Sequence, residues 1–93
     1  MNLEVIKQQL ITVLKKYPVT RAAVFGSFSR NEQNTDSDID LLIELSEKFT
    51  LFQILKLERE LSDTVARKID LVEYSAIKPS IRERILKEAI PIL

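Results

Sequence analysis

The spacing of apolar residues along the chain predicts six elements, in the order helix, strand, strand, helix, strand, helix. The first helix follows a possible Asn2 cap and ends at Tyr17-Pro18, because proline disfavours helical backbone in the residue before it. Its apolar stripe consists of Leu3, Ile6, Leu10, Val13 and Leu14.

Three short apolar segments predict strands. The first, Ala22 to Phe25, runs into Gly26-Ser27 and then into a polar loop that is rich in turn-forming residues. The second, Ile39 to Leu45, is β-branched and apolar enough to be buried on both faces, which is typical of a central strand. The third is marked by Ile69, Leu71 and Val72.

Two further helices flank the third strand. Thr50 and Gln53 have the form of a capping box, which predicts a helix that reaches to about Ala66. The last helix begins near Pro79, a residue favoured in a first turn, and Pro91 closes it. The expected apolar stripes are Leu51, Ile54, Leu55, Leu61 and Val65 in the earlier helix, and Ile81, Ile85, Leu86 and Ala89 in the last.

This element order implies an α/β (α+β) fold with a small mixed three-stranded sheet packed with helices. The loop between the first two strands is too short for a crossover helix, so those strands should be antiparallel. The 24 residues from Glu44 to Arg67 are enough for a helical crossover, so the third strand should run parallel to the second. Gly26-Ser27, Asp38, Asp40 and Asp70 are then expected at one edge of the sheet.

That edge concentrates carboxylates. Asp38 and Asp40 are two residues apart on a strand and therefore point to the same face, where they repel each other unless a cation lies between them. Mg²⁺ prefers such oxygen ligands, and Asp70 could supply the third carboxylate of a two-metal site for phosphoryl transfer. Between Asn31 and Glu47 the chain has no Lys or Arg but six acids, Glu32, Asp36, Asp38, Asp40, Glu44 and Glu47.

The turn before the polar loop has the residues of a phosphate site. Gly26 is the only glycine in the chain, and a glycine turn lets backbone N–H groups approach a phosphate closely. The Ser27 hydroxyl adds a donor, and the Arg30 guanidinium could pair with phosphate oxygens.

The composition of the chain excludes several kinds of chemistry and of binding partner. The 93 residues include neither cysteine nor histidine, which excludes disulfides, thiolate metal sites and the commonest general base. The 14 Lys and Arg balance the 14 Asp and Glu, whereas binding to a nucleic-acid backbone normally needs a basic excess. The longest apolar run is too short for a membrane span, and the N-terminus lacks a signal-peptide core. We expect a single cytoplasmic domain, residues 1–93, that binds neither nucleic acid directly nor a membrane.

Three segments together resemble the signature of the DNA polymerase β nucleotidyltransferase superfamily. They are Gly26-Ser27-Phe28-Ser29-Arg30, Asp38-Ile39-Asp40-Leu41-Leu42-Ile43 and Lys68-Ile69-Asp70-Leu71-Val72. The short chain is similar to the minimal nucleotidyltransferases, the MntA-type antitoxins encoded beside toxins of the HEPN family.

This resemblance implies Mg²⁺-dependent transfer of AMP from ATP to a hydroxyl, typically a tyrosine of the HEPN toxin partner. Gly26, Ser27 and Arg30 would hold the nucleotide. Asp38, Asp40 and Asp70 would be the catalytic carboxylates and metal ligands.

Several alternatives stay open. The protein could be a non-catalytic antitoxin of the same fold, or a nucleotidyltransferase that acts on a small molecule. Asp70 could simply face solvent on an edge strand, and Arg30 could be a loop charge. A calcium loop from Asp36 is rejected, because Leu41 stands where such a loop needs glycine. Val5, Ile11 and the apolar C-terminus either form a surface that binds a partner or belong to a broader core stripe.

Overall fold

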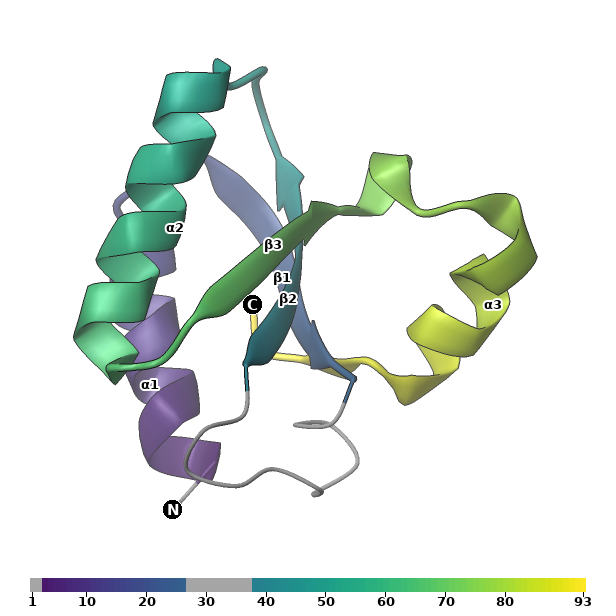
Figure 1. The fold of residues 1–93 in the computed structure, drawn as a ribbon, viewed down its shortest axis with the longest axis horizontal. Coiled ribbons are helices and arrows are strands. Elements are labelled where there is room, and N and C mark those ends of the chain that lie inside the picture. Colours follow the sequence, from purple (N-terminus) through teal and green to yellow (C-terminus); the bar gives the residue numbers. More distant parts are fainter. Residues whose placement is uncertain (1–2, 27–37) are drawn as a thin grey trace.

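The computed structural model describes residues 3–26 and 38–93, and the predicted order of elements is confirmed (Figure 1). Two short elements that the sequence pattern missed are a 3-10 turn, η1, after the third strand and a last strand, β4. No helix in the described ranges is long and apolar enough to cross a membrane. The elements are α1 (Leu3–Leu14), β1 (Val19–Phe25), β2 (Ile39–Leu45), α2 (Leu51–Val65), β3 (Ile69–Glu73), η1 (Tyr74–Ala76), α3 (Pro79–Glu88) and β4 (Ile90–Pro91).

The sheet has the strand order β3-β2-β1-β4, with β2 antiparallel to β1 and parallel to β3, as predicted. The expectation of three strands is wrong, because β4 pairs antiparallel with β1 through Ala23 opposite Pro91 and Val24 opposite Ile90. A strand of two residues has no periodicity to recognise, and Pro91 suggested only the end of a helix. Proline is acceptable here because β4 is an edge strand, where one side of the backbone needs no partner.

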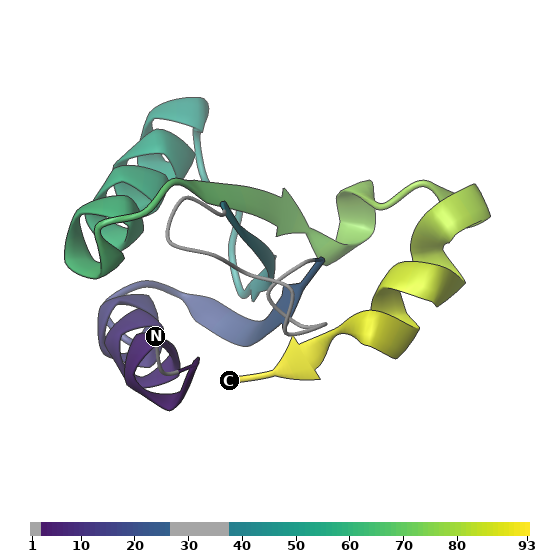
Figure 2. The same cartoon turned by 60° about the horizontal axis from the view of Figure 1, so that its bottom comes forward.

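Helices α1 and α2 lie side by side over one face of the sheet (Figure 2). Their buried residues pack on Ile39, Leu41 and Ile43 of β2, all of which are fully buried. Each such side chain contributes about 1.5–3 kcal/mol through removal of apolar surface from water. This face therefore anchors the central strand, which contains Asp40 and is directly preceded by Asp38.

The buried stripe of α2 differs from the predicted one. Leu61 and Val65 are buried as expected and Leu57 joins them, whereas Leu51 and Leu55 are 72% and 50% exposed. The residues that meet the sheet are spaced four apart, at 57, 61 and 65, and Leu51 and Leu55 point away from this row. The capping box of Thr50 and Gln53 is confirmed in both hydrogen bonds.

A polar contact joins the end of α1 to α2. The Tyr17 hydroxyl donates a hydrogen bond of 2.6 Å to Glu60, and Lys16 forms an ion pair with the same carboxylate. The hydrogen bond to Glu60, helped by burial, raises the pKa of Tyr17 to about 12. The hydrogen bonds that Glu60 accepts from Lys16 and Tyr17 lower the pKa of its carboxyl.

The other face of the sheet is covered only in part. Ala23 and Leu42 pack there against Tyr74 and Ile77, and Ile85 of α3 and Ala89, which follows α3, add to the margin. The predicted stripe of α3 is half wrong, because Ile81 and Leu86 are 45% and 40% exposed. Figure 1 shows that α3 stands beside the sheet and not flat on it, and Ile85 is its only apolar residue that is half-buried against the sheet.

Of the apolar residues outside the predicted stripes, some are exposed, as a partner surface would be, and others belong to a broader core. Val5 is 55% exposed and Leu93 is 37% exposed, whereas Ile11 and Ile92 pack with the core. Exposed apolar surface therefore exists, but only part of the suspected excess contributes to it.

Candidate active site

Strand β2 sets the positions of Asp38 and Asp40. Because side chains alternate along a strand, Ile39 and Leu41 face the helices while Asp40 faces the opposite side. Asp38 directly precedes the strand and is exposed, and Asp40 is half-buried. The Ile39 amide donates a 2.9 Å hydrogen bond to the Lys68 carbonyl, which fixes the start of β2 against β3.

Strand β3 places Asp70 beside Asp40. The two residues are register partners in the parallel pair, so their side chains leave the sheet on the same face. The Asp70 side chain is 43% exposed, and its Oδ1 lies 3.9 Å from Lys68 Nζ. Strand β3 is an edge strand, as the alternative for Asp70 supposed, yet its register delivers the carboxylate to the predicted place.

The backbone of Gly26 runs against the Asp40 carboxylate. Gly26 has φ +74, a left-handed conformation that residues with a side chain rarely adopt. A Cβ at this position would lie 2.3 Å from Asp40 Oδ2, closer than real Cβ contacts. The glycine is therefore needed twice, for its backbone conformation and for the space that the carboxylate fills.

Ser27 and Arg30 lie outside the described residues, so their roles in holding a nucleotide stay predictions. The structure does add Lys68, which sequence reasoning left without a role. The signal for it was present, because Lys68 stands two residues before Asp70, directly before β3 begins.

The donor set of the site suits Mg²⁺, since carboxylate oxygens are the ligands that this ion prefers. Asp40 and Asp70 are register partners, and Asp38 lies two residues before Asp40, directly before the strand begins. As the described side chains stand, no three acidic groups are close enough to hold a metal ion. The right donors are thus adjacent, and the two-metal arrangement stays a prediction.

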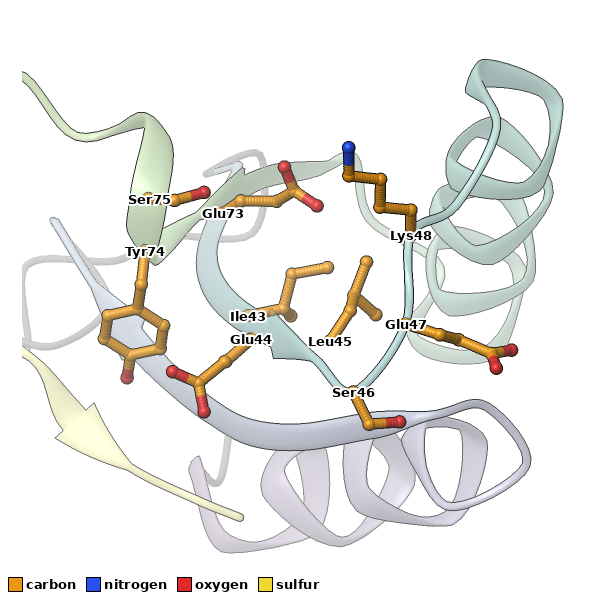
Figure 3. Close-up of a pocket in the computed structure, with 9 residues that line it drawn as sticks. All are labelled: Ile43, Glu44, Leu45, Ser46, Glu47, Lys48, Glu73, Tyr74 and Ser75. Atoms are coloured by element: carbon orange, nitrogen blue, oxygen red, sulfur yellow. The ribbon is translucent and has the colours of Figure 1, made fainter.

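A separate pocket of about 430 Å³ lies at the far ends of β2 and β3 (Figure 3). Ile43 and Leu45 stand at its centre, with Glu73 and Lys48 along one side. Its lining begins at Ile43, about 10 Å along β2 from Asp40, given a rise of about 3.3 Å per residue. This pocket is therefore not part of the carboxylate edge.

Beside this pocket, Arg21 connects three elements. Its guanidinium lies 4.4 Å from the centre of the Tyr74 ring and 3.7 Å from a Glu44 carboxylate oxygen. The cation–π contact and the ion pair hold η1 and the ends of β1 and β2 together. Arg21 therefore has a structural role at this end of the sheet.

Comparison with known proteins shows to which family the chain belongs. The family model described as "Polymerase beta, Nucleotidyltransferase" matches residues 8–93. The chain belongs to this nucleotidyltransferase family. The resemblance seen in the sequence motifs is thereby confirmed, together with the polymerase β-like fold class and nucleotidyltransferase activity.

Comparison with individual relatives supports the same family assignment. A Methanocaldococcus jannaschii protein described as a protein adenylyltransferase is 41% identical over 93 residues, which is 100% of both chains. A solved structure described as a minimal nucleotidyltransferase is 33% identical, with a TM-score of 0.83 over 98% of this chain and 96% of that one.

A third comparison shows the fold alone. A chain from a complex of a tri-AMPylated Shewanella oneidensis HEPN toxin with an MNT antitoxin has a TM-score of 0.76 at 15% identity. The match covers 97% of this chain and 71% of the other.

Proposed function

We propose that this nucleotidyltransferase moves AMP from ATP to a hydroxyl of a partner protein, a tyrosine of a HEPN-family toxin, and acts as the antitoxin of that toxin. The observation that carries the proposal is the register pairing of Asp40 with Asp70, with Gly26 packed against Asp40. A full-length relative described as a protein adenylyltransferase supports a protein acceptor. The HEPN–MNT complex of the same fold suggests the class of partner.

The predicted nucleotide site would lie where β1 ends. Gly26 would let backbone N–H groups approach the triphosphate, with the Ser27 hydroxyl and the Arg30 guanidinium as further donors. Asp38, Asp40 and Asp70 would hold Mg²⁺, which when bound supplies positive charge that stabilises the transferring phosphoryl group.

The transfer itself forms one bond and breaks one. The acceptor oxygen attacks the α-phosphorus of ATP, and the bond from that phosphorus to the oxygen bridging to the β-phosphate breaks, so pyrophosphate leaves. Asp70, on the edge strand and 43% exposed, is open to an incoming hydroxyl and would accept its proton. Asp40 is more enclosed, between Gly26 and β3, and its carboxylate would be held in place.

The acceptor would come from the partner. Residues 1–93 would act as one catalytic domain, and the carboxylate edge would face the protein that delivers the hydroxyl. The expected cytoplasmic location stays a prediction.

Transfer of label tests this proposal. Native lysate would receive ATP labelled at the α-phosphate, with Mg²⁺, and either the wild-type protein or the Asp38→Asn, Asp40→Asn double variant. The control is Asp63→Asn, which removes an exposed carboxylate of α2 that is not among the predicted site residues. We expect one labelled protein band with wild type and with Asp63→Asn, and none with the double variant.

Two outcomes would contradict the assignment. Label that persists in the double variant would mean that Asp38 and Asp40 do not carry the reaction. No protein label with wild type, while the double variant still neutralises the toxin, would favour an antitoxin that acts by binding alone.

A further inference from the structure

Lys68 lies inside the carboxylate edge. Its Nζ is 3.9 Å from Asp70 Oδ1, and its backbone carbonyl accepts the Ile39 amide at 2.9 Å. Ile39 and Ile69 are the first register partners of β2 and β3, and Asp40 and Asp70 are the next pair. Lys68 and Asp38 are the residues that directly precede this pairing. Lys68 and Asp70 are two residues apart and lean toward the same face. The ammonium group of Lys68 thus lies beside the carboxylate of Asp70, whose register partner is Asp40.

The position of this charge matters more than the strength of the ion pair. The Lys68 side chain is 68% exposed, and a surface ion pair of this kind adds little to stability. A divalent cation held by Asp40 and Asp70, however, would share the Asp70 carboxylate with this ammonium group. A positive charge in this place would partly neutralise Asp70 and would repel a cation that binds there.

We propose that Lys68 is a built-in counter-ion of the carboxylate edge, which compensates Asp70 before a divalent cation binds and weakens the binding of that cation on its own. This inference rests on the proposed function, because it takes the three carboxylates to be a metal site. Lys68 acts as a positioning charge and takes no part in bond making. One consequence is that the cation enters more readily together with the anionic triphosphate than alone.

Coulomb's law sets the expected size of the effect. A unit charge about 4–6 Å from a divalent cation, in a site open to water and salt, changes the affinity by roughly fivefold. If Lys68 only tied down the start of β3, its removal would change stability but leave the metal affinity unchanged.

The test uses Mn²⁺ alone, without nucleotide, and measures free Mn²⁺ by its electron paramagnetic resonance signal during a titration. Lys68→Met removes the charge and keeps the length of the side chain, and Lys68→Arg keeps the charge. Lys87→Met is the matched control, because Lys87 forms a similar exposed pair with Glu83 on α3, at 4.0 Å. We expect Mn²⁺ to bind Lys68→Met about fivefold more tightly than wild type. The affinities of Lys68→Arg and Lys87→Met for Mn²⁺ should lie within twofold of the wild-type value.

The outcomes separate the two claims. Equal or weaker Mn²⁺ binding by Lys68→Met, while wild type binds, would overturn the counter-ion role alone. No Mn²⁺ uptake by any variant would contradict the metal site and the proposed function, and with them the effect of Lys68 on metal binding.

A second measurement needs no metal. In EDTA, Lys68→Met should lower the melting temperature by about 1–4 °C, and it should do so less in the presence of Asp70→Asn. An equal loss in both backgrounds would show that Lys68 does not compensate Asp70.

Discussion

Gly26→Ala is the substitution that tests most sharply how the backbone supports the carboxylate edge. The φ of +74 at Gly26 costs a residue with a Cβ about 1–2 kcal/mol. The new Cβ would lie 2.3 Å from Asp40 Oδ2, so the carboxylate has to retreat by about 1 Å to reach an ordinary contact distance. A displacement of about 1 Å in a reacting geometry costs about a hundredfold in rate.

Two assays on the same variant separate these costs. Urea unfolding should show a folded protein that has lost about 1–2 kcal/mol, and the rate of AMP transfer should fall about a hundredfold. The control is Ala66→Gly at the end of α2, where an alanine has φ 55 and no role in the site. It should gain about 0.5–1 kcal/mol and keep full activity. Full transfer by Gly26→Ala would refute the reasoning, because Asp40 would then not depend on the glycine.

Two predictions concern the fold. Leu41→Ala should lower the free energy of unfolding by about 2–5 kcal/mol in urea titrations, since Leu41 is fully buried between β2 and the helices, and a loss below 1 kcal/mol would contradict that packing. Tyr17→Phe should cost about 1 kcal/mol at pH 8, because the Tyr17 hydroxyl donates to Glu60. The pKa of Tyr17 rises from 10.0 to about 12 in the fold, so this contribution is fully present below pH 10 and lost as the pH rises toward 12. A difference between Tyr17→Phe and wild type that does not change between pH 8 and 12 would argue against the hydrogen bond.

The central strand and the carboxylate edge could be predicted because their signals are local and strong. Ile39 to Leu45 has few alternatives to a buried strand, and once β2 is fixed, loop lengths determine the directions of β1 and β3. The capping box of Thr50 and Gln53 likewise depends only on residues three apart. Asp40 and Asp70 came together for these reasons.

The errors arose where tertiary packing makes the decision. A helical pattern shows that α2 has apolar sides but not which side meets the sheet, so Leu51 and Leu55 were assigned to the wrong one. Strand β4 exists only because β1 offers it an edge, which no local pattern reveals. Ser27 and Arg30 lie outside the described residues and stay predictions.

The most direct test of the central claim is the intact mass of a HEPN-family toxin after incubation with this protein, ATP and Mg²⁺. Wild type should increase the mass of the toxin by one or more AMP groups, and Asp40→Asn should leave it unchanged while remaining folded. A toxin left unmodified by wild type, or modified equally by Asp40→Asn, would contradict the assignment of AMP transfer to the edge formed by β2 and β3.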